Sequence, residues 1–232
     1  MFEKRKYPAI ALQKWRNIFF LHWHVDERCL QRMIPEPFIV DTFSGQAWIT
    51  IVIFQAKYSR PRLFPQQFSL KEMYQINVRT YVMNPIDRER GVYFFALRVG
   101  HPYISPLMGK MFSLPFIRAD ITCEQATKRT LSISCIEKEK HAFQSTCTTT
   151  LKPHHSPLAT FLAERYCIWN VHDGKIIKLP LSHSSWDLFQ GDTTVLTNEI
   201  VPLEIEEPPF VHYAKEKTAY IHPYETYGYY RK

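Results

Sequence analysis

Residues 73–82, MYQINVRTYV, decide the fold class, because apolar and polar side chains alternate along them. Successive side chains of a β-strand point to opposite faces, so Ile76 and Val78 share one face while Asn77 and Arg79 share the other. The polar face of such a strand usually meets water in an antiparallel sheet, and the pattern alone favours that interpretation. The alternative is a polar face that lines a cavity, because a barrel of about eight strands can hold one small ligand. Arg79 would then anchor a carboxylate through its planar guanidinium group.

Short runs of the same kind recur along the chain and predict a mainly β (α+β) protein. We expect further strands at residues 17–25, 38–43, 47–55, 92–99, 116–124, 130–137, 143–151 and 193–201, and on both sides of a turn at 172–175. The second and third of these should form a hairpin around Ser44-Gly45. Asp26 is expected to cap one short helix, and Ser156 followed by Pro157 a second. This content favours one antiparallel barrel-like sheet or a sandwich.

The amino-acid composition excludes several classes of protein. The 232 residues are 45% hydrophobic, 15% aromatic and 22% charged, which excludes a disordered tail, a collagen-like fibre and a coiled coil. No repeat or composition shift marks a boundary, so we expect a single domain over 1–232, with a basic segment at 1–14 and an acidic, proline-bearing loop at 203–209. The longest apolar run, residues 47–54, is far shorter than the roughly 20 residues that span a bilayer. We therefore expect a cytoplasmic protein with no membrane partner.

The net charge of +7 is concentrated at the two ends of the chain. Five basic residues against Glu3 give +4 within the first 16 residues, and Arg231 and Lys232 add two more charges. Residues 17–230 are close to neutral in net charge, whereas a nucleic-acid-binding protein has a basic stripe on a folded face. We therefore expect no nucleic-acid partner. The five cysteines are odd in number and contain no C-x-x-C pair, which favours reduced thiols in the cytoplasm.

The histidines offer the first candidates for chemistry. His22 and His24 lie on one face of an expected strand, a geometry compatible with zinc, but no third ligand is adjacent. We prefer a paired structural face and predict no metal, and His22 is kept as a ligand-binding candidate. His183 follows a strand and would project a polar group at a barrel mouth or equally fix a turn. No phosphate-binding loop, G-x-G-x-x-G, G-x-S-x-G or H-E-x-x-H motif is present, so no cofactor is predicted.

Four more residues are candidates for the pocket. Glu72 would serve as a general acid or base if an apolar wall raised its pKa, and its structural alternative is a solvent-facing carboxylate. Arg118 would clamp an acidic ligand together with Arg79 if both pointed inward. Trp48 and Trp186 add mass to the core and would also wall a cavity.

Motifs spread over roughly residues 15–190 then carry a resemblance. In order they are Phe20-x-His22-Trp23, Asp41-Thr42-Phe43-Ser44-Gly45-Gln46-Ala47-Trp48, Asn77-Val78-Arg79-Thr80-Tyr81-Val82, Gly91-Val92-Tyr93-Phe94-Phe95, Leu114-Pro115, Glu164-Arg165-Tyr166 and His183-x-x-Trp186. The sequence resembles the YqjF-like family of uncharacterised bacterial proteins. That family is similar in fold to acetoacetate decarboxylase, so the resemblance implies an antiparallel barrel-like sheet around a small pocket.

The resemblance to the decarboxylase ends where its chemistry should be. That enzyme forms a Schiff base on a lysine activated by a second lysine, and the resemblance places the pair just after Leu114-Pro115. Phe116 and Ile117 stand there instead, and neither can form an imine. Arg118 stays protonated, and the nearest amine, Lys110, has no lysine beside it. If the protein is an enzyme, the sequence predicts that it is not a Schiff-base acetoacetate decarboxylase.

Two functions from different classes follow from these observations. The preferred one is a small-molecule-binding barrel, catalytic or not, whose ligand is a small organic acid or carbonyl compound. The alternative is an interaction or regulatory protein with a vestigial pocket, in which the tyrosine-rich residues 220–230 form a partner or self-association surface. We prefer to interpret those tyrosines as a strand that closes the sheet, and a homo-oligomer is left open. A cavity lined by Asn77 and Arg79 would support the first function. A third, weaker hypothesis is a metal-dependent enzyme that uses His22 and His24.

Overall fold

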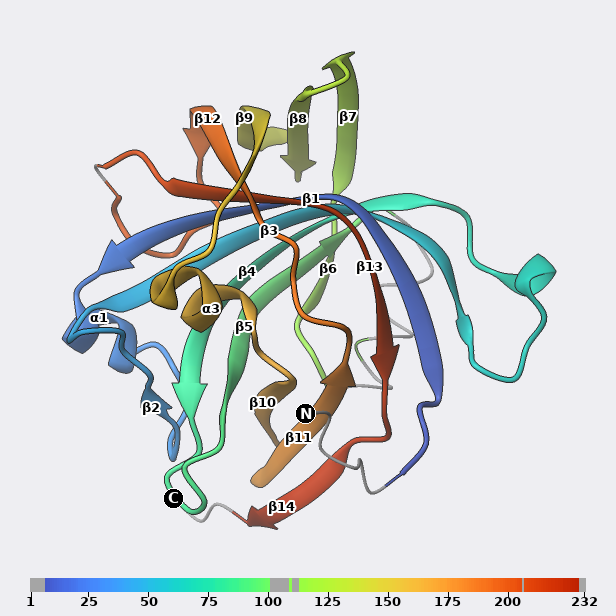
Figure 1. Cartoon of the computed structure of the whole chain (residues 1–232). Helices are drawn as coiled ribbons and strands as arrows, with labels where there is room; N and C mark the ends of the chain where they lie inside the picture. The colour runs from blue at the N-terminus through green and yellow to red at the C-terminus, as the bar shows by residue number, and fades with distance from the viewer. Residues whose placement is uncertain (1–6, 101–108, 110–112, 206, 230–232) are drawn as a thin grey trace.

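A computed structural model describes residues 7–100, 109, 113–205 and 207–229 (Figure 1). The first half contains β1 (Ala11–Val25), α1 (Glu27–Gln31), β2 (Ile39–Val40), β3 (Ala47–Pro61), the 3-10 helix η1 (Gln66–Phe68), β4 (Met73–Met83), β5 (Arg90–Val99) and β6 (Phe116–Arg118). The second half contains β7 (Asp120–Thr127), β8 (Thr130–Glu137), β9 (Lys140–Pro153), α3 (Pro157–Ala163), β10 (Cys167–His172), β11 (Lys175–Ser182), β12 (Phe189–Asn198), β13 (Phe210–Ile221) and β14 (Glu225–Tyr229). The charges at Lys4, Arg5, Lys6, Arg231 and Lys232 lie outside the described residues.

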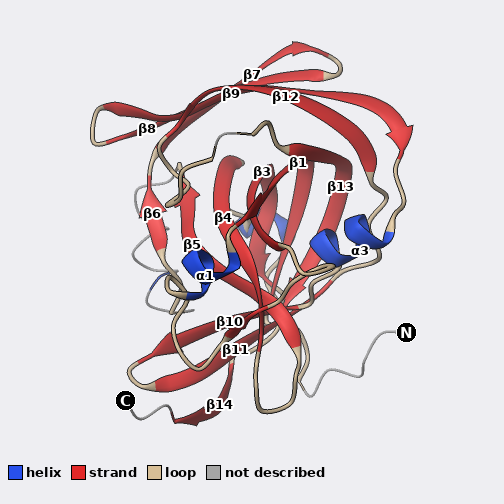
Figure 2. Cartoon of the chain, turned by 90° about the vertical axis from the view of Figure 1, so that its left-hand side faces the viewer, coloured by secondary structure: helices blue, strands red, loops and turns tan. Residues whose placement is uncertain are grey.

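The strands form one sheet that closes on itself. Its order is β14-β11-β10-β5-β4-β3-β1-β13-β12-β9-β8-β7, and an additional pairing of β11 with β13 joins the ends of a ring. Most pairs are antiparallel, while β5 pairs in parallel with β10 and β6. The remaining strands β12, β9, β8 and β7 fold over the outside of the ring as a second layer (Figure 2). The prediction of a mainly β, barrel-like sheet with a few short helices is confirmed.

Both faces of the central strands are buried, which explains the long apolar run in β3. Ile49, Ile51 and Ile53 point outward into the core beneath the second layer. Val52 and Phe54 point into the ring. Strands that are covered on both faces carry continuous apolar sequence rather than simple alternation. The ring therefore has an interior with its own chemistry, separate from the core outside it.

Both predicted helix caps are confirmed, and both helices are short. Asp26 Oδ1 accepts a hydrogen bond from the Cys29 amide at 2.7 Å at the start of α1. Ser156 Oγ accepts from the Ala159 amide at 3.0 Å at the start of α3. Within the described ranges, no helix is long and apolar enough to cross a membrane.

One predicted hairpin forms only at its turn, and one predicted strand is divided. Phe43 and Gln46 pair across Ser44-Gly45 through two backbone hydrogen bonds, so the turn is as predicted. The pairing goes no further into 38–43, because β2 pairs with the end of β4 through Val40 and Val82. Pairing of β3 with β4 stops at Thr80, so the edge of β4 beyond that residue is free for β2. The expected strand at 116–124 is divided at Ala119, where the chain leaves β5 and begins to pair with β8.

Candidate functional site

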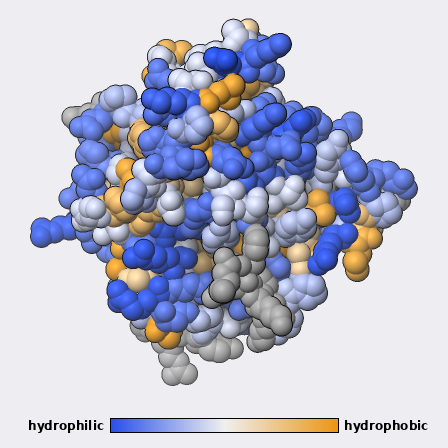
Figure 3. Space-filling model, viewed as in Figure 1, coloured by the Kyte–Doolittle hydropathy of each residue, from blue (hydrophilic) through white to orange (hydrophobic). Residues whose placement is uncertain are grey.

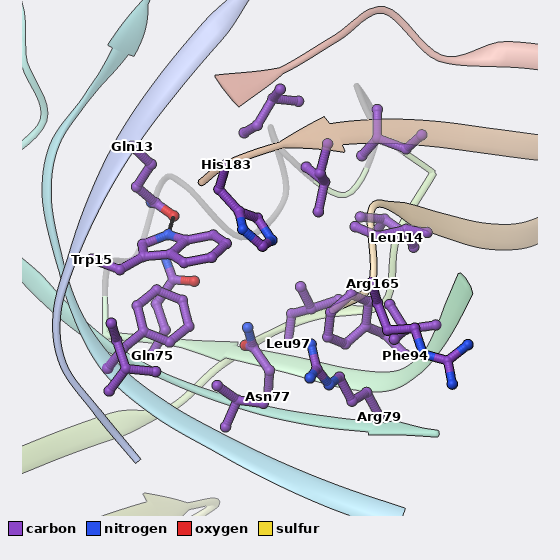
Figure 4. Close-up of a pocket in the computed structure, with 18 of the residues that line it drawn as sticks. Gln13, Trp15, Gln75, Asn77, Arg79, Phe94, Leu97, Leu114, Arg165 and His183 are labelled. Atoms are coloured by element: carbon purple, nitrogen blue, oxygen red, sulfur yellow. Dashed lines mark hydrogen bonds between the residues drawn. The ribbon is translucent and has the colours of Figure 1, made fainter. Parts of the chain in front are cut away.

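The interior of the ring holds a cavity of about 140 Å³. One wall comes from β1, β3, β4 and β5, and the other from β10, β11 and the segments that follow α3 and β11 (Figure 4). Most of the wall is apolar, including Phe20, Val52, Phe54, Phe94, Leu97 and Leu114. An apolar cavity of about 150 Å³ accepts benzene. A ligand of roughly that size therefore fits this space.

Three inward side chains of β4 give the cavity a polar stripe. Gln75, Asn77 and Arg79 alternate with Ile76 and Val78, which point outward into the core beneath the second layer. Gln75 and Asn77 are buried and Arg79 is half-buried. The polar face of β4 thus does not meet water, which the alternation alone favoured, because the ring closes around it.

Arg79 brings a positive charge into this interior. Its Nη2 donates to the Leu162 carbonyl oxygen at 3.0 Å, and its Cζ lies 5.6 Å from the centre of the Phe20 ring. The buried Nε of Arg79 and Oδ1 of Asn77 have no hydrogen-bond partner in the described part of the chain. No carboxylate of the described residues forms an ion pair with Arg79 either. Because an uncompensated buried charge is costly, this part of the cavity is electrostatically suited to an anion.

A second arginine, Arg165, contributes only its stem to the cavity. Its Nη1 donates to Asp41 Oδ2 at 2.7 Å, and its Nε donates to the Phe161 carbonyl oxygen at 2.8 Å. Burial lowers the pKa of Arg165 from its usual value, and the neighbouring Asp41 acts in the opposite direction. The guanidinium group turns away from Asn77 and Arg79 (Figure 4). The charge of Arg165 is therefore neutralised within the protein, while that of Arg79 faces the cavity.

Aromatic side chains from β1 and from the segment after β11 gather at one end of the cavity. The rings of Trp15 and Trp186 stack with centres 6.2 Å apart, and His183 lies 5.0 Å from Trp186. Trp15 Nε1 donates to Gln13 Oε1 at 2.5 Å, and Gln13 Nε2 donates to Ser59 Oγ at 2.7 Å. These bonds fix the Trp15 ring at the end of the cavity where β1 begins. The indole N–H of Trp186 is buried and has no acceptor among the described residues.

His183 is the cavity residue best suited to move a proton. Its Nδ1 lies 2.9 Å from the Ser184 carbonyl oxygen, which can only accept, so Nδ1 carries the hydrogen. Burial lowers the pKa of His183 below the usual value, so the ring is neutral near pH 7. Its Nε2 then has a free lone pair, and the ring projects into the cavity (Figure 4). A neutral imidazole in this position can accept a hydrogen bond or a proton from a ligand.

Glu72 and Arg118 lie outside the cavity. The exposed Glu72 carboxylate pairs with Lys57 Nζ at 2.7 Å and accepts from Gln55 Nε2 at 3.2 Å. Arg118 is exposed at the end of β6, and the next residue, Ala119, is buried in the core beneath the second layer. The structure therefore does not bring these two side chains to Arg79, and the expected arginine clamp does not form.

His22 lies in the interior of the ring within a hydrogen-bonded series. Its Nδ1 is 2.9 Å from Thr50 Oγ1, and its Nε2 is 3.1 Å from His212 Nδ1. Thr50 Oγ1 is in turn 2.7 Å from Tyr81 Oη, which donates to the Leu162 carbonyl oxygen at 2.9 Å. The Leu162 carbonyl oxygen also accepts a hydrogen bond from Arg79. The series therefore helps to hold the Arg79 guanidinium group in place without itself lining the cavity. Burial lowers the pKa of His22 and lowers that of His212 to about 4.

Trp48 and His24 lie at the other end of β1 from the cavity mouth. They line a separate groove of about 640 Å³ with His22 and with Glu204 and Glu207 of the expected acidic loop. His24 Nε2 is 2.9 Å from Glu207 Oε2. Among the described residues, no three His, Cys, Asp or Glu side chains meet in a way that could hold a metal ion. The metal hypothesis therefore has no third ligand within that part of the chain.

Several lining residues were not selected from the sequence, Gln75 and Trp15 among them. Gln75 had a signal, because it stands two positions before Asn77 on the same face of β4. Trp15 had none, because its place at the mouth depends on how β1 crosses β3 and on its stacking with Trp186.

Comparison with known proteins places this chain in a family. The model of DUF2071, described as an uncharacterized conserved protein, matches residues 12–218. The chain belongs to the DUF2071 family. The uncharacterized protein YqjF of Bacillus subtilis (strain 168) is 27% identical over 225 residues, which cover 92% of this chain and 91% of YqjF. The resemblance to YqjF-like proteins is thereby confirmed.

Solved structures confirm the fold of the DUF2071 chain. Acetoacetate decarboxylase from Legionella pneumophila superposes with a TM-score of 0.72 at 12% identity, over 99% of this chain and 92% of that one. The enduracididine biosynthesis enzyme MppR, solved with pyruvate, gives 0.70 at 11% identity, over 99% and 95%. An acetoacetate decarboxylase-like enzyme from Sphingomonas wittichii RW1 gives 0.65 at 13% identity, over 95% and 94%. These likenesses show a shared fold.

The cavity wall of the DUF2071 chain shows what stands where the decarboxylase resemblance places its lysines. Leu114 and Phe116 line the cavity there. No lysine belongs to the wall among the described residues. Lys110, the nearest amine in sequence, lies outside those residues.

Proposed function

We propose that this DUF2071 protein binds a small organic acid in the barrel cavity, with the carboxylate at Arg79 and Asn77. The observation that supports this most directly is the guanidinium group of Arg79, which enters a buried cavity without a carboxylate partner among the described residues. A carboxylate would accept charge-assisted hydrogen bonds from it. The apolar and aromatic walls would hold the hydrocarbon part of the ligand.

Size and fold point to the same class of ligand. A cavity of about 140 Å³ suits a compound with roughly as many heavy atoms as benzene. MppR, which has the same fold, was solved with pyruvate, a small oxo acid. His183, neutral and opposite Arg79, would accept a hydrogen bond or proton from the ligand, and we keep it as the candidate acid–base group. The five cysteines, odd in number and without a C-x-x-C pair, favour the cytoplasm as the place where this binding occurs.

The first test is the affinity of small carboxylates for the wild type and for Arg79→Met. An acid at about 100 times its Kd should stabilise the wild type by about 2.7 kcal/mol, which is roughly 5–10 °C in Tm for a chain of this size. Loss of a charged hydrogen bond should weaken binding about 10- to 100-fold in Arg79→Met. The measurement is a thermal-shift screen of carboxylates and their matching amides, followed by calorimetry on the best acid.

Arg118→Met is the matched control, because Arg118 is exposed and outside the cavity. It should bind the acid as the wild type does. Arg79→Met should fold normally, since no described carboxylate loses its partner. Equal affinity in Arg79→Met and wild type, or an equal loss in both variants, would show that Arg79 is not the anchor. If no carboxylate binds the wild type, the interaction-protein alternative becomes the better explanation.

The alternative function gains no specific support from the C-terminal tyrosines that the structure describes. Tyr220 pairs with Ser182 where β13 closes on β11, and β14 continues along that edge of β11, across from β10. Tyr227 donates to the Asp87 carboxylate. This end of the chain therefore closes the sheet, which was the preferred interpretation of its sequence.

A further inference from the structure

The loop between β3 and β4 exposes large apolar side chains beside the cavity mouth. It projects from the ring at the right of Figure 1. At its tip Leu63 is 94% exposed and Phe64 is 53% exposed. Figure 3 shows the corresponding orange group at the right-hand edge of the molecule. Apolar side chains held this far out of the protein gain free energy only when a partner removes them from water.

Basic side chains surround this tip. Residues 57–72 contain four basic residues and one acid, Glu72, which Lys57 Nζ neutralises at 2.7 Å. Arg60 Nη1 donates to the carbonyl oxygens of Arg62 and Phe64, so it folds the tip and keeps a positive charge beside its backbone. Arg62 and Lys71 are exposed. The tip therefore combines an apolar point with a net positive base.

Further exposed apolar side chains continue from the loop to the mouth. Leu70 and Ile10 are 41% and 43% exposed. The Arg62 amide donates to the Ile10 carbonyl oxygen at 2.8 Å, and the Leu70 amide donates to Ser59 at 2.9 Å. Ser59 and Leu70 also line the cavity. These contacts place the apolar tip, its charges and the cavity entrance on one end of the barrel.

We propose that this end, defined by Arg60, Arg62, Leu63, Phe64 and Leu70 and called the mouth surface, docks reversibly on an anionic membrane. Leu63 and Phe64 enter the boundary between head groups and acyl chains. Arg60 and Arg62 contact the acidic head groups, and the cavity then opens toward the membrane. A basic, apolar protrusion is the pattern of a peripheral membrane contact. The proposal replaces the sequence-based expectation of no membrane partner and is independent of the proposed acid binding.

A second copy of the chain fits this surface less well. The complementary acidic groove contains Glu204 and Glu207 and lies at the opposite end of β1. Docking of the mouth surface into that groove would be head-to-tail, and a contact of this type propagates into rings or filaments instead of closing a dimer. A flat anionic surface matches the projecting charges without this constraint.

The expected binding is weak. Each basic residue near an anionic surface strengthens binding about fivefold. With two apolar anchors, the partition constant should be comparable with that of a single acyl chain, about 10⁴ M⁻¹. It should fall as salt is added, because exposed charges are screened beyond about 10 Å at 0.1 M.

The test is sedimentation of the full chain with vesicles of phosphatidylcholine alone or with about one-third phosphatidylserine. We expect binding to the anionic vesicles at low salt, little binding to neutral ones, and release at 0.5 M salt. Leu63→Ser/Phe64→Ser should reduce binding at least tenfold and Arg62→Gln about fivefold. The controls are Leu196→Ser, which removes an apolar side chain that is 71% exposed on β12, and Lys128→Gln, which removes a charge from an exposed turn. Both controls should bind like the wild type.

Three results would overturn the proposal. The first is that the wild type does not bind anionic vesicles at low salt. The second is that Leu63→Ser/Phe64→Ser binds them as well as the wild type does. The third is that light scattering shows self-association which this variant abolishes, while no protein binds to vesicles. The last result would identify a second copy as the partner. All substituted residues are exposed, and the Tm of each variant is measured so that a loss of folding is not mistaken for a loss of binding. Acid affinity is measured without vesicles, which separates failure here from failure of the proposed function.

Discussion

Asp41→Ala should destabilise the protein by about 3–5 kcal/mol, the largest loss that we expect from a single polar substitution. The Arg165 side chain is 4% exposed, and its Nη1 lies 2.7 Å from Asp41 Oδ2. Removing the carboxylate would leave this guanidinium group buried without its counter-charge. The remaining hydrogen bond to the Phe161 carbonyl oxygen and the aromatic faces beneath it cannot replace a full negative charge.

Urea unfolding of Asp41→Ala against Arg90→Gln measures this loss. Arg90 also approaches Asp41, at 3.5 Å, but its side chain is 61% exposed, so its removal should cost no more than about 1 kcal/mol. The double variant Asp41→Leu/Arg165→Met should recover most of the loss, because it removes both buried charges together. If Asp41→Ala loses no more unfolding free energy than Arg90→Gln, Asp41 is not the counter-charge on which the buried Arg165 depends.

Acidification from pH 7.5 to 4.5 should weaken folding by several kcal/mol. Burial lowers the pKa of His212 to about 4, against 6.5 for an exposed histidine. Between these values the unfolded chain binds the proton more readily than the folded one, so stability falls as pH falls through this window. The full difference for His212 is about 3 kcal/mol. The lowered pKa values of His22 and His183 act in the same direction.

Unfolding free energies measured at half-unit steps of pH test this expectation. His212→Gln should be less stable at pH 7.5, because it alters the contact with His22, yet its stability should decline less on acidification. His155→Gln, at an exposed position, should follow the wild-type curve. A wild-type curve that is flat between pH 6.5 and 4.5 would show that the buried histidines do not control stability there.

The alternation in β4 predicted its strand correctly but not its surroundings. Periodicity of two separates Asn77 and Arg79 from Ile76 and Val78, and nothing local says whether the polar side meets water or a closed interior. That depends on β11 pairing with β13, residues that are distant from β4 in sequence. The polar face of β4 can be assigned to a cavity only when the closure of the ring is known.

The candidate site shows the same limit. Asn77, Arg79, His183 and Trp186 line one cavity, as their selection anticipated, although their roles in binding remain proposals. Glu72 and Arg118 have suitable chemistry, but residue type does not fix the direction of a side chain at the end of a strand or at a division between strands. At Ser44-Gly45 the turn was predicted correctly, since Phe43 pairs with Gln46 across it. The partner of the residues before the turn was not, because a turn signal does not decide between two partners when β4 offers a free edge.

The pairing that completes the ring is also one of its shortest. β11 meets β13 through only two residue pairs, Leu181 with Ile221 and Ser182 with Tyr220, whereas β1 pairs with β3 along nearly its whole length. Leu181 and Ile221 are both in the cavity wall. Segments held by few hydrogen bonds open first in native proteins. Amide hydrogens at this seam should exchange with solvent earlier than those of β3 and β4, and the lifetime of the closed seam sets how long a molecule inside stays trapped.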